Sequence, residues 1–376
     1  MSPRPWFALA SLLLGCAPAS EGAASRSDES PRAVRDDPTT LGAPLPGGAI
    51  DPSFEAPSLD LLPMALAVAP DGKVLVGGGR TLARFEENGA LDRSFGRDGI
   101  LVDATMSAAD VTLQPDRKIL VAGIEPNAAE GSRGLVLAVV RLLPDGTHDR
   151  SFGNDGKVVV GPERLSTPDG VSRIVVRPDG RIVAAASFYP APAIASLGPD
   201  GSLDAVAQTS SFGGLTMDGR ERVAIAERDA IARFDRDTAF FLRNGEGRTY
   251  TLPTAGTDGS IVAACNDTTN GLCRWTNDAV PDPSFGVAGR ATLGWSAKGL
   301  ALDSAARPIA IAHNGIAYAL ARLDARGASD RGFGRDGFVP YDGTPRRVVV
   351  TADDRIVVAG VESGTTSRLR VTRYLP

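Results

Sequence analysis

Residues 114–123 read QPDRKILVAG, a polar turn followed by an apolar run, and variants of this phrase return along the chain. The six related turns begin at Pro70, Pro178, Met217, Thr257, Ser304 and Ala352. With the second residue of each turn as a marker, the steps between copies are 45, 63, 39, 40, 47 and 48 residues. A period in the forties that contains only strand-like segments is typical of a β-propeller with about four strands per blade.

One repeat unit reads as three strands around polar turns. In the first unit we expect strands over 64–69, 73–77 and 82–86, with Pro70-Asp71-Gly72 as the first turn. The second strand of each unit is almost continuously apolar, as in ILVAG and IVVAG. A strand with one solvated face would alternate apolar and polar residues, so these strands are predicted to be covered on both faces by neighbouring blades.

A second phrase built around phenylalanine also recurs. Clear copies start at Asp51, Asp92, Asp149, Asp282 and Asp330, and weaker forms lie around Phe212 and over 237–240. The first copy precedes any complete unit, whereas the last unit ends after a strand at 369–374 with no copy behind it. We therefore predict an all-β, seven-bladed propeller closed by pairing of the N- and C-terminal strands, with the Phe phrase as the outermost strand. The recurring Phe95, Phe152, Phe285 and Phe333 are predicted to pack between blades.

The best-preserved unit joins Gln114–Gly123 to Arg141–Gly156, which reads RLLPDGTHDRSFGNDG. It resembles the delta-60 repeat family, a β-propeller of unknown function, and the resemblance extends over residues 51–376. The strand order is also similar to that of NHL propellers, which implies that the first strand of each unit is innermost. Neither resemblance supplies a catalytic residue.

The first residues resemble a bacterial lipoprotein leader. Arg4 precedes a short apolar stretch that ends in Leu-Leu-Gly-Cys at Cys16, a lipobox-like run. The resemblance implies a signal peptide over 1–15, lipidation of Cys16, a disordered tether over 16–50 and the propeller over 51–376. We expect a lipid-anchored protein of the cell envelope, and Ala17 after the cysteine favours the outer membrane.

The two other cysteines flank one predicted hairpin loop. Cys265 ends a second strand and Cys273 opens a third. Because an envelope protein lies in an oxidising compartment, we predict a disulfide between them, with two free buried thiols as the alternative.

Composition excludes several classes of function. The formal net charge is −5 and there is no basic run, which excludes binding to nucleic-acid phosphates. The two histidines are isolated, and His148 is expected to be a solvated turn residue, so neither a metal site nor a cofactor is predicted. Aspartates that precede glycine are assigned to turn hydrogen bonds, although calcium in the acidic loops near Asp145 and Asp155 is an open alternative.

The sequence favours a non-enzymatic binding or scaffold module, with an envelope protein, a glycan or a small ligand as its partner. Two insertions in the 63-residue step, over 125–134 and 161–172, are the candidate binding loops. Their candidate binding residues are Glu125, Asn127, Glu130, Arg133, Glu163, Arg164 and Asp169. The alternative is a propeller enzyme of the lactonase, lyase or quinone-dependent dehydrogenase type with a site on the axis. The ligand and the oligomeric state stay open.

Overall fold

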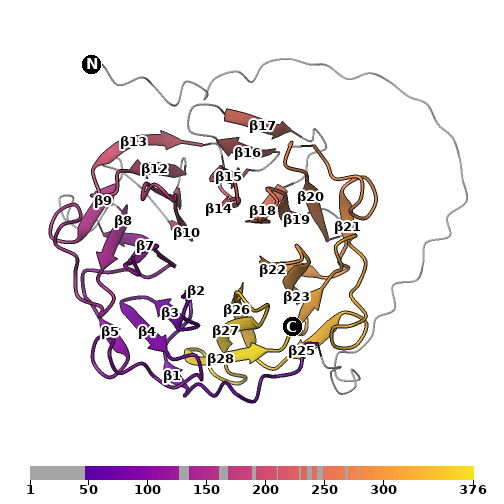
Figure 1. Ribbon diagram of the computed structural model, residues 1–376, viewed down its shortest axis with the longest axis horizontal. Coiled ribbons are helices and arrows are strands. Elements are labelled where there is room, and N and C mark those ends of the chain that lie inside the picture. The colour runs from indigo at the N-terminus through magenta and orange to yellow at the C-terminus, as the bar shows by residue number, and fades with distance from the viewer. Residues whose placement is uncertain are drawn as a thin grey trace, which may run out of the picture.

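The computed structural model describes residues 47–126, 135–160, 168–188, 192–209, 211–227, 230–234, 239–243, 249–266, 270–278 and 280–376. These residues form seven four-stranded antiparallel sheets arranged in a ring, which confirms the predicted seven-bladed propeller (Figure 1). Among them, no helix has the length and apolar character needed to cross a bilayer.

Each blade uses its strands in the same order from the axis outwards, apart from the blade that closes the ring. The innermost strands are β2 (Ala65–Val68), β6 (Asp110–Leu113), β10 (Pro168–Val176), β14 (Gly214–Met217), β18 (Thr249–Ala255), β22 (Ser296–Leu302) and β26 (Thr344–Val350). The second strands are β3 (Val74–Gly78), β7 (Ile119–Pro126), β11 (Ile182–Phe188), β15 (Val223–Ala226), β19 (Ile261–Asn266), β23 (Pro308–His313) and β27 (Ile356–Val361). The third strands are β4 (Thr81–Phe85), β8 (Leu135–Leu142), β12 (Ala193–Leu197), β16 (Ala230–Phe234), β20 (Gly271–Trp275), β24 (Tyr318–Arg322) and β28 (Arg368–Tyr374). The outer strands are β5 (Ile100–Val102), β9 (Lys157–Val160), β13 (Leu203–Gln208), β17 (Ala239–Arg243), β21 (Arg290–Thr292), β25 (Phe338–Tyr341) and β1 (Leu59–Asp60).

The core is divided into clusters that lie between adjacent blades. In one of them, Leu75 and Leu82 of the first blade contact Val121 and Val140 of the second. The second strands contribute to the clusters on both sides of their own blade, so their continuous apolar runs are covered on both faces as predicted. Burial between blades is therefore the main source of stability.

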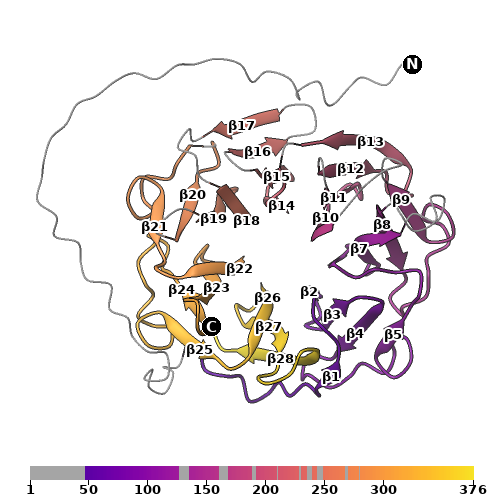
Figure 2. The same cartoon turned by 180° about the vertical axis from the view of Figure 1, so that it is seen from behind.

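The ring closes where the two ends of the described chain meet, beside β28 (Figures 1 and 2). Strand β1 pairs antiparallel with β28, with Leu59 opposite Leu369. Ahead of β1, Ile50 bridges Tyr374, and the backbone N–H of Asp51 donates to the carbonyl of Arg373 at 2.8 Å. Closure by the N-terminal segment is confirmed.

The Phe phrase, however, is a turn and not the outermost strand. The N–H of Phe95 donates back to the carbonyl of Asp92, and Gly96 then takes a positive φ of 54°. This conformation suits glycine and cannot continue a strand. The outer strand follows a few residues later, so the closing strand is Leu59–Asp60 and not 51–54.

In five of the seven blades, an arginine on the third strand binds the Phe phrase. Arg84 Nε donates to Asp92 Oδ2 at 2.7 Å, and its guanidinium lies 4.6 Å from the centroid of the Phe95 ring. Arg84 Nη1 also donates to the carbonyl of Pro144 in the next blade. We call this the Arg–Asp–Phe cluster, and it recurs at Arg141-Asp149-Phe152, Arg274-Asp282-Phe285, Arg322-Asp330-Phe333 and Arg373-Asp51-Phe54. The phenylalanines are buried in clusters between blades, as predicted.

One of the two weaker sequence matches is wrong. Phe212 lies immediately before the inner strand β14 and not ahead of an outer strand, while the match over 237–240 begins outside the described residues. In the fourth unit, the Asp218 N–H donates to the carbonyl of Arg222, so Asp218 opens the turn as Asp303 does in the sixth unit. The correct marker of the fourth turn is therefore Arg220, two residues after the marker used above.

Candidate functional site on the propeller axis

A cavity of about 160 Å³ lies between the inner strands. Its walls come from β2, β6, β10, β18, β22 and β26. Of these strands, the five that are labelled in Figures 1 and 2 surround the axis in both views. The lining contains four cationic side chains, Arg173, Lys298, Arg346 and Arg347, and one carboxylate, Asp110. Apolar residues such as Leu66, Leu252 and Leu300 complete the wall.

Three of the charged residues occupy the same position of the repeat. Asp110, Arg173 and Arg347 each lie opposite an alanine of the second strand, respectively Ala122, Ala185 and Ala359. The small partner leaves room for a large charged side chain at this level of the blade.

The same position carries uncharged residues in the other four blades. They are Ala65, Gly214, Thr251 and Gly299. The propeller therefore does not need a charged residue there in order to fold.

The other two cations are extra residues at β-bulges. The register of β26 shifts between Pro345 and Arg347, which leaves Arg346 unmatched on β27. The register of β22 shifts in the same way between Ala297 and Gly299, around Lys298. A bulge redirects side chains relative to the regular strand, and here it adds a cation to the cavity from each of two neighbouring blades.

The arginines lie close enough to affect one another. Burial, together with the positive charges of Arg173 and Arg346, lowers the pKa of Arg347 to about 10, and Asp110 acts in the opposite direction. Burial raises the pKa of Asp110, against the effect of Arg173 and Arg347. Asp110 Oδ2 accepts a hydrogen bond from the backbone N–H of Ile174 at 3.0 Å, which fixes the carboxylate beside β10.

Two donors at this site have no acceptor. In the part of the chain that the structure describes, Nε of Arg346 and Nε of Arg347 are buried without a hydrogen-bond partner. Arg347 Nη1 donates to the carbonyl of Arg346 at 2.9 Å, which holds the guanidinium near its own strand. Buried donors usually find partners, so these two N–H groups are available to an acceptor that enters the cavity.

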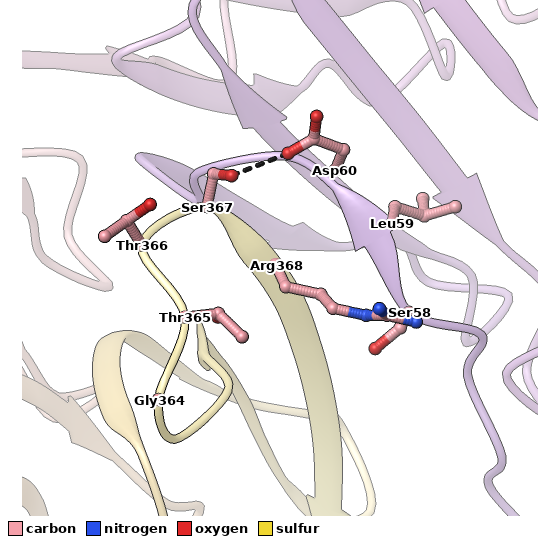
Figure 3. Close-up of a pocket in the computed structure, with 8 residues that line it drawn as sticks. All are labelled: Ser58, Leu59, Asp60, Gly364, Thr365, Thr366, Ser367 and Arg368. Carbon is pink, nitrogen blue, oxygen red and sulfur yellow. Dashed lines mark hydrogen bonds between the residues drawn. The ribbon is translucent and has the colours of Figure 1, made fainter.

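A larger, more open cavity of about 500 Å³ lies at the rim of the closing blade (Figure 3). Several of its polar groups already bond to one another or to nearby side chains. Ser367 Oγ donates to Asp60 Oδ1 at 2.6 Å, and Glu362 accepts from Ser58 and pairs with Arg368. This site therefore offers fewer unsatisfied groups to a ligand than the axial cavity.

The predicted loop residues are only partly described. Glu125 lies near the end of β7, where its carboxylate pairs with Lys157 Nζ at 2.5 Å, so it braces the outer strand β9. Asp169 lies in the extended inner strand β10, so the second insertion lengthens this strand from Pro168 onwards. Asn127, Glu130, Arg133, Glu163 and Arg164 lie outside the described residues, and their role stays a prediction.

Cys265 and Cys273 lie on the adjacent strands β19 and β20 with Cα atoms 5.8 Å apart and their sulfur atoms at bonding distance. They are offset in register, because Cys265 lies opposite Gly271 and Cys273 opposite Ala263. This geometry is compatible with the predicted disulfide.

The turn aspartates have the predicted structural role. Asp145 Oδ1 accepts from the Thr147 N–H at 2.9 Å, and Asp71, Asp179, Asp200 and Asp258 make the same bond two residues ahead. Within the described ranges, no three His, Cys, Asp or Glu side chains form a group that could hold a metal ion.

The expectation for His148 is wrong. Its side chain is only 29% exposed, and its Nε2 lies 2.5 Å from Asp103 Oδ2 in the preceding blade. The turn that carries it packs against the neighbouring outer strand, which supplies a carboxylate that its sequence context did not reveal.

Comparison with known proteins supports the repeat family. Residues 69–95, 114–152 and 177–205 match the family described as "domain of unknown function (DUF5122) beta-propeller". No curated protein sequence matches the chain.

Three solved structures have a similar fold. The WD40 β-propeller domain of Doa1 shares 11% identity over 88% of this chain and 97% of its own, with a TM-score of 0.53. A chain of the mitotic checkpoint complex shares 10% identity over 96% of this chain and 100% of its own, with a TM-score of 0.56. A puromycin hydrolase mutant shares 16% over 88% of this chain and 55% of its own, with a TM-score of 0.50. At these identities the structures establish the fold alone, and the family match, which extends over three segments of the chain, supports a family of repeat-built β-propellers of unknown function.

Proposed function

We propose that this protein is a non-enzymatic binding module anchored to the cell envelope, and that the axial cavity is its binding site. The observation that carries the proposal is the set of four cations and one carboxylate that line this cavity. Site residues, and not the propeller fold, decide function.

The repeat does not need the charged residues of the cavity lining in order to fold. Ala65, Gly214 and Gly299 stand at the position of Arg347 in other blades, so the inner strand forms without a charge there. Like charges gathered in a partly buried space destabilise the folded state. Their presence is best explained by a ligand that binds among them.

The proposed location rests on the sequence of the leader. The lipobox-like run ending at Cys16 supports lipidation and attachment to the outer membrane, and the neighbouring sulfurs of Cys265 and Cys273 suit an oxidising compartment. A tethered propeller would hold its axial cavity close to the membrane, where it could bind a small ligand or an exposed group of a larger partner.

The proposal is tested by native mass spectrometry of protein purified from the envelope fraction. We expect a small ligand to co-purify with the wild-type chain and to be lost from Leu300→Trp, which fills the cavity with an uncharged side chain. Ile316→Trp is the matched control, because Ile316 lies on the same blade and is 91% exposed. Equal ligand content in all three proteins would refute an axial binding site, and conversion of the ligand by the wild type alone would support the enzyme alternative.

A further inference from the structure

We infer that the axial cavity binds a compact oxyanion of the phosphate or sulfate class, either as the free ion or as the terminal group of a monoester. This inference rests on the proposed function, since it names the chemistry that the axial site would recognise. It is carried by three observations: the charge of the lining, its unsatisfied donors and the size of the cavity.

The charge of the cavity is opposite to that of the protein. The whole chain has a formal net charge of −5, yet the lining places four cations against the single carboxylate of Asp110. A cleft lined by one sign of charge focuses the field and concentrates counter-ions. The excess of three positive charges favours a dianion over a monoanion, because a dianion neutralises more of the mutual repulsion.

The donors are of the type that recognises oxyanions. Nε of Arg346 and Nε of Arg347 are buried without an acceptor among the described residues. A guanidinium presents its N–H groups in a planar fork that matches phosphate and carboxylate oxygens, and such charge-assisted bonds are stronger than neutral ones. Arg173 and Lys298 add positive charge from two other blades, so an ion in the cavity would meet cations from several sides.

The cavity is small. Its volume of about 160 Å³ corresponds to roughly five water molecules at ~30 Å³ each. Sites for drug-sized ligands are larger, at about 300–1,000 Å³. A single phosphate or sulfate group fits the available space, whereas the rest of a monoester would extend from the mouth of the cavity.

The test measures binding and thermal stability of the mature protein in sodium phosphate, sulfate, acetate or chloride at one ionic strength and pH 7.5. We expect phosphate and sulfate to raise the melting temperature in a saturable manner, and acetate and chloride to have much smaller effects. Calorimetric titration with inorganic phosphate should give an affinity that falls as sodium chloride is added.

Variants of the axial arginines provide the decisive comparison. Arg347→Ala should weaken phosphate binding about tenfold or more, because it removes a charged donor. It should fold normally, since the first blade carries Ala65 at this position. Arg347→Lys keeps the charge and loses the planar fork, so its affinity should lie between those of the wild type and Arg347→Ala. Arg370→Ala is the control, because Arg370 pairs with Asp342 at the surface of the same blade.

Three outcomes would overturn the inference: no response to phosphate or sulfate beyond that to chloride, equal binding by Arg347→Ala, or equal loss in Arg370→Ala. Glycerol 3-phosphate separates the two sources of the group. Competition by this monoester supports a headgroup that extends from the cavity, and binding of inorganic phosphate alone supports the free ion. A neutral co-purifying ligand together with no phosphate response would refute the oxyanion and leave the binding module intact.

Discussion

The aspartate of the Arg–Asp–Phe cluster makes this propeller sensitive to acid. Burial of Asp149 disfavours its charged form, but hydrogen bonds from Ser151 and Lys118 and the charge of Arg141 outweigh this effect and hold its pKa well below the usual range. The pKa values of Asp51, Asp92 and Asp282 are lowered by similar bonds. Because the folded-state pKa lies below the unfolded value, this stabilisation is present above about pH 4 and is lost as the pH falls further.

We therefore expect the melting temperature to fall steeply below about pH 4, and Asp149→Asn to reduce this dependence while it destabilises the protein at pH 7. Since the pair with Arg141 is largely buried, the cost should be about 3–5 kcal/mol. The exposed pair of Arg150 and Asp155 is the control, and Asp155→Asn should cost less than about 1 kcal/mol. Denaturant melts at several pH values measure both effects, and equal costs at the two sites would contradict the cluster's role.

The carboxylate of Asp110 leads to a second prediction, which holds only if the axial cavity binds an oxyanion. Asp110→Asn keeps an oxygen that accepts from the Ile174 N–H but removes the negative charge beside Arg173 and Arg347. Phosphate should then bind severalfold more tightly, and the phosphate-free protein should melt at a lower temperature. Titration and melting of this variant beside the wild type measure both changes, and weaker phosphate binding would argue against an anion beside Asp110.

The sequence contained a signal for the axial site that is visible only once the repeats are aligned. Asp110, Arg173 and Arg347 each lie six residues before the turn residues Asp116, Asp179 and Asp353. Sequence reasoning missed them because a charge on a strand is usually solvated, and only the ring shows that this position lies beside the axis. Lys298 and Arg346 were still harder to predict, because they lie at β-bulges and a β-bulge does not change the period of the repeat.

At the scale of elements, the N-terminal segment closes the ring through strand pairing and also through side-chain contacts. Strand β1 contributes only two paired residues, whereas Asp51 binds Arg373 at 2.7 Å and Phe54 packs beneath its guanidinium at 4.8 Å. Removing this segment would expose the edge of β28 and take the Asp51 carboxylate and the Phe54 ring away from Arg373.

A protein that begins at Leu61 should therefore unfold at much lower denaturant concentration than one that begins at Gly47. Loss of the buried Phe54 side chain alone should cost about 3–5 kcal/mol. The protein that begins at Gly47 is the control, because it keeps every described contact of the closure. Coincident unfolding curves would show that closure does not depend on these residues.

Closure was predictable because it follows from the order of the repeated phrases along the chain. This order can be read without knowing the secondary structure that each phrase adopts. The conformation of the Phe phrase was not predictable in the same way. Aromatic residues favour strands, but here the Asp side chain caps a tight turn and the following Gly96 adopts positive φ. Local hydrogen bonds therefore override strand propensity at this position.

The hairpin of β19 and β20 carries the two buried cysteines, and their oxidation state can be measured. With Cα atoms 5.8 Å apart, a disulfide closes a short loop and should contribute at most about 3 kcal/mol. The double variant Cys265→Ser with Cys273→Ser should fold and melt at a modestly lower temperature. Thiol labelling of unreduced, denatured wild-type protein should modify neither cysteine, and labelling of both would show that they are free thiols.

At the scale of the whole molecule, the proposed attachment to the membrane depends on Cys16. The lipobox-like run is the feature of the sequence on which the proposed anchoring rests. Each buried methylene of an acyl chain contributes about 0.8 kcal/mol, so more than one chain gives stable attachment. Loss of Cys16 should therefore change the location of the protein without changing the stability of the propeller.

We expect Cys16→Ser to move the protein from the membrane fraction to the soluble fraction, or to leave its leader uncleaved. Incorporation of labelled palmitate should disappear in the same variant. The variant that lacks Cys265 and Cys273 is the matched control, because it loses two cysteines of the chain and keeps the lipobox. If Cys16→Ser stays in the membrane fraction with normal processing, the protein must be attached by another route, and the lipobox-like run would not be its anchor.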